Sequence, residues 1–321
     1  MDHKRLPPKG TEGLPKYADL SYDTSFKVAF GHKAVLMSFL NTFLIREGDP
    51  PITDLVYRDK ELGPSHAENR KVLFDVYCTT QDHRHIIVEM QRTKQTHFLE
   101  RALYYISFHI QNQTSWHEDA KVAKGVPWTF EMDPVVFVGI TNFVLFPHIT
   151  SPVHHLELVE RASGTIASDK IGLLFIELPK FKATTLPECS TLSERWGFYL
   201  RYIHTLDMEP TEEPDPGLRV LLNQALMANF SFEDLEAYIA EHNQTWVRNA
   251  EREAAIEDGK MLGREEGREE GRKEGREEGR EENQTRTVLN MHNKGFTLEQ
   301  IVAATELTKE AVVRILEENA A

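Results

Sequence analysis

Two carboxylates in the stretch FDVYCTTQDHRHIIVEMQR, residues 74–92, have types and a spacing that could do chemistry. Two runs rich in β-branched and aromatic residues flank a polar centre, which predicts a β-hairpin. A turn centred on Asp82 places Asp75 directly opposite Glu89. Cβ atoms of opposed residues lie about 4.5 to 5.5 Å apart, where two like charges are destabilising.

A divalent cation is one explanation for the opposed acids. A hard ion such as Mg²⁺ is held by one or two carboxylates and keeps several waters. Gln91 projects from the same face as Glu89, since side chains alternate along a strand, and its amide could orient a water or a phosphate oxygen. The alternative is a solvent-facing strand pair with hydrated acids and with Arg84 or Arg92 nearby. Spacing alone leaves both explanations open, because a one-residue slip in strand register would move every side chain to the other face of the hairpin.

The two faces of the predicted hairpin differ in polarity. One face is apolar and is expected to lie in the core: Phe74, Val76, Cys78, Ile86, Val88 and Met90. The other face is largely polar, most of all at the end of the hairpin away from its turn: Asp75, Tyr77, Thr79, His85, Ile87, Glu89 and Gln91.

The elements around the hairpin are expected from the spacing of apolar residues. Residues 22–44 carry phenylalanines and leucines three and four apart, which predicts a helix that Gly31 divides and that Ser21 or Asp23 caps. Residues 94–114 predict a second helix of several turns. Strands are expected at 52–62, 135–146, 154–161 and 170–177.

Composition and charge set limits on class and partners. A chain of 321 residues with 40% hydrophobic residues is a foldable globular protein. The net charge of -14 gives no global attraction to nucleic acid or anionic membrane, so any phosphate-binding surface must be local. Cys78 and Cys189 are expected to be reduced thiols. The N-terminus lacks a signal-peptide core, and VVFVGITNFVLF falls short of the ~20 apolar residues of a membrane span, so we expect a cytoplasmic, soluble protein.

The composition changes along the chain and predicts five parts. From Leu192 onward the pattern is helical, and a repeat of Gly, Arg and Glu follows. The expected parts are a flexible arm over 1–16, an α/β domain over 17–185, a helical extension over 186–250, the repeat as a linker or helix over 251–283, and a small helical hairpin over 284–321.

The repeat GREEGREEGRKEGREEGREE favours a solvated linker. Each glycine costs a helix about 1 kcal/mol relative to alanine, and charged pairs three residues apart return only a few tenths. A helix is the alternative, because glycine at every fourth position would form a stripe along which a second helix could approach and make a homo-oligomer.

Residues 295–319 have the length and apolar spacing of a small helix-turn-helix. Its expected core is Ile301, Val302, Leu307, Val312, Ile315 and Leu316. The second helix sets Lys309 and Arg314 against four glutamates, which is a poor surface for phosphate. Contact with a protein is therefore favoured over DNA targeting.

The order of elements and several motifs resemble a known family. The PD-(D/E)XK nuclease core has a similar order of elements: a helix, a strand, a hairpin that carries Asp and then Glu-x-Gln, a second helix and a further strand. The matching motifs are DTSFKVAFG at 23–31, FDVY at 74–77, VEMQ at 88–91, RALYYIS at 101–107, FVGITNFVLF at 137–146 and IELPKF at 176–181. Over most of its length the chain resembles the Rpn family of recombination-promoting nucleases and transposases, a branch of the PD-(D/E)XK superfamily.

The resemblance implies an α/β restriction-endonuclease-like core, with a mixed sheet flanked by helices and an all-α C-terminal extension. It implies a DNA endonuclease that depends on Mg²⁺ or Mn²⁺ and is associated with recombination or mobile elements. Asp75 and Glu89 would be the metal ligands, with the Met90 carbonyl as a third. The alternative is a catalytically inactive nuclease fold that serves as a DNA-binding or protein-interaction module, which the acidic net charge keeps open.

Gln91 would be catalytic at the position where the superfamily usually has lysine. Glutamine can hydrogen-bond but cannot offset developing charge. Lys94 or Arg101 could supply the missing cation, although an exposed helix face would also explain either residue.

Further residues could join the site. Many relatives carry another acid upstream, and the sequence does not choose between Glu61 and Glu68, which also suit an ordinary surface. Arg101 and Tyr105 share a helix face and could approach the phosphate or the acids. Tyr104 is favoured as a core residue.

Overall fold

The computed structural model describes residues 13–46, 48–59, 61–62, 72–122, 130–210 and 212–319, without the side chains of 61, 62, 72 and 114–122. The chain divides into two compact units, Met1–Gln244 and Thr245–Ala321. The finer five-part division stays a prediction, and most of the expected arm lies outside the described residues.

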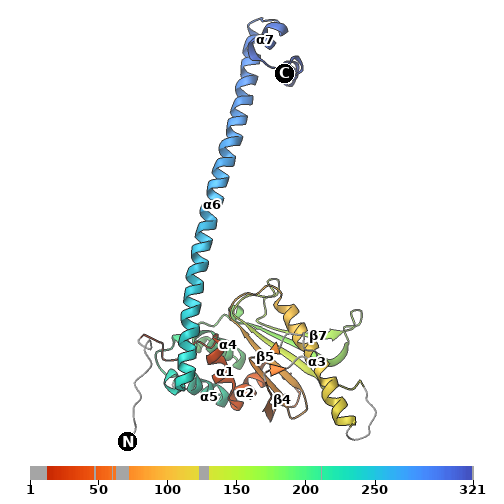
Figure 1. Cartoon of the computed structure of the whole chain (residues 1–321), viewed down its shortest axis with the longest axis vertical. Helices are drawn as coiled ribbons and strands as arrows, with labels where there is room; N and C mark the ends of the chain where they lie inside the picture. The colour runs from red at the N-terminus through yellow and green to blue at the C-terminus, as the bar shows by residue number, and fades with distance from the viewer. Residues whose placement is uncertain are drawn as a thin grey trace. The chain divides into compact units, whose positions relative to one another are not determined.

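A six-stranded mixed sheet organises the first unit (Figure 1). Its order is β1-β4-β5-β6-β8-β7, with β5, β6 and β8 mutually parallel and the other pairs antiparallel. The strands are β1 (Leu55–Tyr57), β4 (Val76–Thr80), β5 (His85–Gln91), β6 (Val135–Thr141), β7 (Val153–Val159) and β8 (Ile166–Glu177). A separate two-stranded ladder pairs β2 (Glu61–Leu62) with β3 (Val72–Leu73). The mixed sheet flanked by helices confirms the expected fold class.

The central strand β6 is buried along its whole length. Val135 and Phe137 face one hydrophobic layer, and Val136 and Val138 face the other. Gly139 lies between aromatic rings, and a Cβ there would come within 2.9 Å of the Phe175 ring. A strand buried on both faces reads as a continuous apolar run, which is what the sequence shows here.

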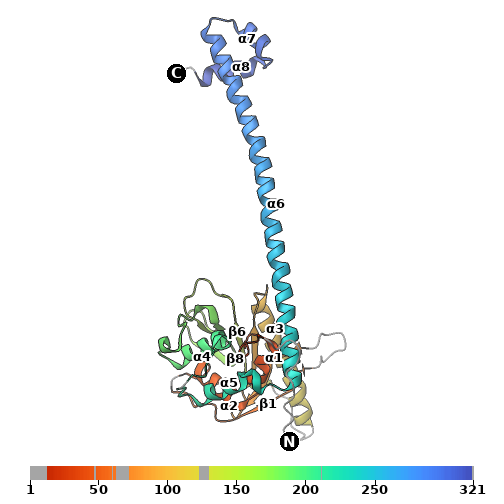
Figure 2. The same cartoon turned by 90° about the vertical axis from the view of Figure 1, so that its left-hand side faces the viewer.

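Four helices cover one face of the sheet, and Figure 2 shows this side of the first unit. They are α1 (Asp23–Phe30), α2 (Lys33–Phe43), α4 (Leu192–Tyr202) and α5 (Pro216–Ala225). Phe30, Phe39 and Trp196 form an aromatic cluster with ring centroids 5.1 to 6.1 Å apart. The division of α1 from α2 at Gly31 is confirmed. Short 3-10 helices complete the connections at Leu178–Lys180, Leu186–Glu188, Ile203–Thr205 and Met227–Asn229.

The helix α3 (Phe98–Val122) covers the opposite face. Phe98, Ala102 and Ile106 pack against a second layer of sheet residues. Tyr104 does not lie in the core as expected, because 49% of its surface is exposed. At that point of the helix the packed face is already occupied by Ala102 and Ile106, so Tyr104 points outward.

Phe74 packs on the α3 side and not with Val76 and Cys78, so its predicted face is wrong. The chain bends at Asp75, and β4 begins only at Val76. Strict alternation of side chains holds within a strand and fails at such a bend.

The helix α6 (Phe232–Asn293) runs through the whole repeat, so the favoured linker is wrong. Helical turns on both sides of the repeat supply the nucleus, and propagation costs far less than nucleation. A Cβ on any of the six repeat glycines would meet nothing within 4 Å. Association of two copies along this stripe stays a prediction.

Two short helices, α7 (Leu298–Thr305) and α8 (Lys309–Glu318), belong to the second unit with the end of α6. Ile301 and Val312 are fully buried against Val288, and Val302, Leu307, Ile315 and Leu316 pack around them. Thr297 and Gln300 form a capping box at the start of α7. None of the described helices in either unit is both long and apolar enough to cross a membrane.

A buried polar chain joins α3 to the hairpin. The Tyr77 hydroxyl lies 2.8 Å from His85 Nδ1 and 2.6 Å from His109 Nε2. Gln113 contacts His109 Nδ1 at 3.2 Å and donates to the Asp133 carbonyl. Burial, aided by the nearby His85, lowers the pKa of His109 to about 3. This histidine is therefore neutral in the folded protein at ordinary pH.

We expect His109 to lower the free energy of unfolding as the pH drops from 7.5 to 5.5, a contribution measured as the difference between the parent protein and a variant that lacks this histidine. The unfolded chain takes up a proton on His109 near pH 6.5, whereas the folded chain does not, so acid favours unfolding by on the order of 1 kcal/mol. Urea unfolding at the two pH values measures the fall. His109→Gln should reduce it, and His148→Gln, at an exposed position, should not. An equal fall in all three proteins would contradict the assignment.

Candidate active site

Asp75 and Glu89 lie side by side where the hairpin meets the bend before β4. The pairing of Val76 with Val88 continues the register centred on Asp82. Each acid accepts an N–H from the other strand: Asp75 Oδ2 accepts from the Met90 amide at 2.8 Å, and Glu89 Oε1 accepts from the Asp75 amide at 3.2 Å. The two like charges are therefore held together by backbone hydrogen bonds.

Glu89 is buried and Asp75 is half-buried, so neither is a fully hydrated surface group. Glu89 is only 6% exposed, since α3 covers this face of the hairpin. Burial raises the pKa of Glu89, the neighbouring Asp75 charge raises it further, and Arg101 opposes the shift. Burial likewise raises the pKa of Asp75 against the effect of the Met90 amide, and Asp23 adds to the rise. The solvent-facing alternative is therefore wrong.

Arg101 places its guanidinium beside Gln91 and Glu89. Its Nη2 donates to Gln91 Oε1 and lies 3.9 Å from Glu89 Oε2, and its Nη1 donates to Gln95 Oε1 at 2.6 Å. The side chain is 27% exposed, and its Nε is buried with no hydrogen-bond partner among the described residues. A permanent positive charge thus stands next to the glutamine that occupies the lysine position.

The other predicted accessory residues differ in position. Tyr105 is half-buried, its ring packs on Phe74 at 5.4 Å, and burial together with the Glu89 charge raises its pKa. Lys94 is exposed and forms no hydrogen bond or ion pair with the described residues. Glu61 begins β2, with its side chain undescribed, and Glu68 lies outside the described residues.

Two residues at the site were missed from the sequence. Asp23 and Lys27 form an ion pair of 2.7 Å on α1, and both act on the pKa of Asp75. Asp23 raises it through charge and a side-chain hydrogen bond, and Lys27 lowers it. Their spacing of four residues is typical of an ion pair on an exposed helix surface. Nothing in the sequence indicated that this end of α1 packs against the hairpin.

The donor set suits a hard divalent cation. Among the side chains that the structure describes, no group of three or more His, Cys, Asp or Glu residues could hold a metal ion. Two adjacent carboxylates remain, and burial is the main cause of the raised pKa of each. Mg²⁺ is often bound by one or two carboxylates plus waters and phosphate, whereas zinc needs a fuller protein shell.

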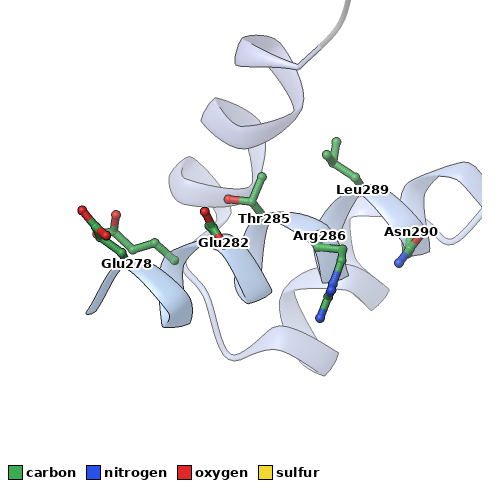
Figure 3. Close-up of a pocket in the computed structure, with 7 residues that line it drawn as sticks. Glu278, Glu282, Thr285, Arg286, Leu289 and Asn290 are labelled. Carbon is green, nitrogen blue, oxygen red and sulfur yellow. The ribbon is translucent and has the colours of Figure 1, made fainter. Parts of the chain in front are cut away.

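A hollow in the second unit has a different character. Figure 3 shows side chains that line it, all from α6: Glu278, Glu282, Thr285, Arg286, Leu289 and Asn290. One helix face provides the whole lining, so we assign no chemistry to this hollow.

We expect the acid pair to lower the stability of the metal-free protein as pH rises from 5 to 8, a contribution opposite in sign to that of His109 and measured against a variant of the pair. The folded pair keeps protons that the unfolded carboxyls, with pKa values near 4, have released, so the free energy of unfolding falls by on the order of 1 kcal/mol. Urea unfolding in EDTA measures this. Glu89→Gln should reduce the fall, Asp207→Asn, at an exposed position, should leave it, and Mg²⁺ should reverse it by binding the ionised pair. The same fall in Glu89→Gln and parent would contradict the raised pKa values.

Comparison with known proteins identifies a family for this chain. The family model of PD-(D/E)XK nuclease family transposases matches residues 20–255, which include α1, the hairpin and α3. No curated protein and no solved structure matches the chain. The family match spans well over half of the sequence and agrees with the resemblance found in its motifs. The chain therefore belongs to the PD-(D/E)XK nuclease family of transposases.

Proposed function

We propose that this protein is a metal-dependent endonuclease that hydrolyses phosphodiester bonds in DNA during recombination or movement of mobile elements. The observation that carries the proposal is the adjacent pair Asp75 and Glu89, linked by backbone hydrogen bonds, with Arg101 beside Gln91. Family membership supports nuclease chemistry and a DNA substrate. The particular ion, Mg²⁺ or Mn²⁺, is part of the proposal.

Asp75 and Glu89 would hold the cation, with the Met90 carbonyl as a third ligand. The chemistry that a divalent cation supplies when bound is a more acidic water and stabilisation of charge on the phosphate. The chain's own residues keep both carboxylates in register through the amides of Asp75 and Met90. Burial under α3 strengthens electrostatic interactions with the substrate, because the local dielectric is low.

Gln91 would orient a water or a phosphate oxygen. Arg101 donates a hydrogen bond to the amide oxygen of Gln91. The amide nitrogen of Gln91, Nε2, donates to the Thr93 carbonyl at 3.3 Å. An amide nitrogen carries two hydrogens, so one is left to donate to the substrate. The glutamine therefore acts as an oriented donor, not as a charge.

Arg101 would supply the positive charge that is missing because glutamine stands where the superfamily usually has lysine. It lies within 3.9 Å of Glu89 and donates a hydrogen bond to Gln91, whereas Lys94 is exposed and forms no hydrogen bond or ion pair with either residue. A guanidinium stays charged at any working pH and can bind a phosphate with two donors. We therefore prefer Arg101 to Lys94 as the group that stabilises developing negative charge.

An inactive module that binds DNA or protein is the second candidate, and the net charge of -14 is the observation in its favour. The two candidates differ in metal binding. Calorimetry with Mn²⁺ should detect binding at millimolar concentration to an active site that uses the acid pair, and an inactive module has no such requirement.

Asp75→Ala should abolish nicking of supercoiled plasmid DNA in the presence of Mg²⁺ or Mn²⁺, with a loss of at least about a hundredfold. The fold should persist, because the site lies at the end of the hairpin and not in its apolar core. Gel assays of initial rates and circular dichroism check both points. Asp207→Ala is the matched control at an exposed acid. Equal cleavage by Asp75→Ala and the parent protein would mean that the site is elsewhere.

Arg101→Ala should lower kcat by about a hundredfold, the usual effect of removing one donor that stabilises a transition state. Arg101→Lys should recover part of this loss, since lysine keeps the charge but not the paired contacts. Lys94→Ala should cleave like the parent protein. Single-turnover kinetics on a labelled duplex separates the cleavage step from DNA binding. A larger defect in Lys94→Ala than in Arg101→Ala would reverse the assignment.

A further inference from the structure

The first turns of α6 contact the segment that leads into α1, although more than 200 residues separate them in sequence. Tyr238 is buried among Ala18, Tyr22 and Phe230. Both α1 and this part of α6 belong to the first unit. The start of α6 is thus part of the structure around the acid pair.

Glu241 caps α1 from a distance. The first N–H groups of a helix lack partners within it and need acceptors from elsewhere. Tyr22, at the N-cap position of α1, provides no side-chain acceptor, and neither Ser21 nor Asp23 takes the predicted capping role. Instead, Glu241 Oε2 accepts the N–H of Thr24 at 3.0 Å. A carboxylate at a helix N-terminus is also favoured by the helix dipole.

A second contact runs from Tyr238 towards the end of β5. The Tyr238 hydroxyl accepts the Asp19 N–H at 3.0 Å. The rings of Tyr238 and Tyr22 form a T-shaped pair with their centroids 5.2 Å apart. The Arg92 guanidinium lies over the Tyr22 ring at 3.8 Å and is 3.8 Å from Asp19 Oδ2. Arg92 directly follows Gln91, so this cluster holds the chain at the C-terminal end of β5, next to the proposed site.

The residues that α1 brings to the acid pair lie in its first turns. Asp23 is the first residue of α1, and Lys27 pairs with it one turn later. An isolated helix of eight residues is not stable in water. Its first turn therefore depends on tertiary contacts such as the one from Glu241.

We propose that Glu241 is a positioning residue, which holds the first turn of α1 so that Asp23 and Lys27 stay against Asp75. Its effect on DNA cleavage rests on the proposed function, but its effect on the position of Asp75 does not. The Met90 N–H reports that position, because it donates to Asp75 Oδ2 at 2.8 Å.

Amide exchange of the full-length protein tests the proposal, with Glu241→Ala, Glu241→Gln and Glu236→Ala as variants. Glu236 is an exposed carboxylate on the same helix and serves as the control. Glu241→Ala should speed exchange of the Thr24 amide and of the Met90 amide, by roughly fivefold for the capped position. Glu241→Gln keeps an acceptor oxygen and should restore most of the protection. Glu236→Ala should match the parent protein.

Plasmid nicking adds a second readout. Glu241→Ala should lower kcat with little change in KM for DNA, and Glu241→Gln should recover most of the rate. Faster exchange at Thr24 alone, with Met90 unchanged, would overturn the proposal, because Glu241 would then only cap α1. No change at either amide would also overturn it. If the parent protein does not cut DNA, the proposed function fails, and the Met90 amide still decides the role of Glu241.

Discussion

The close approach of two carboxylates, Glu89 buried and Asp75 half-buried, is the constraint on which the rest of the site depends. Asp75 and Glu89 repel each other and lose hydration under α3. The protein offsets this with two cross-strand N–H donors and with the Arg101 guanidinium nearby. The raised pKa values of both acids show that the compensation is incomplete. A cation that binds carboxylate oxygens would complete it, which relates the electrostatics of the site to the chemistry of the family.

Elements from three parts of the chain meet at this pair. The hairpin supplies the acids, α3 supplies Arg101 and Tyr105 from one face of the sheet, and α1 supplies Asp23 and Lys27 from another direction. The opening turns of α6 contact α1 through Glu241. The site is therefore built by packing between layers, and each layer also contributes to the hydrophobic core. Its geometry should respond to changes far from the acids.

The hairpin register could be predicted because hydrophobic alternation and the turn position restrict it strongly. The errors occur where local rules stop applying. Phe74 changes face at a bend, and Tyr104 turns outward where other residues fill the packed face of α3. The repeat is helical because the helical turns on either side of it within α6 provide the nucleus. A sum of helix propensities over the residues of the repeat does not include this effect. These are effects of context, and a residue's type alone does not contain them.

The sequence by itself determined the α/β class, the hairpin register that brings Asp75 close to Glu89, and the family, because periodicity and motif spacing are local properties of the chain. Only the tertiary structure decided that Glu89 is buried, that Arg101 and not Lys94 lies beside Gln91, and that Asp23, Lys27 and Glu241 join the same region. Those facts depend on which helix covers which face of the sheet. Such packing is set by contacts between residues up to 219 positions apart, and no local pattern records them.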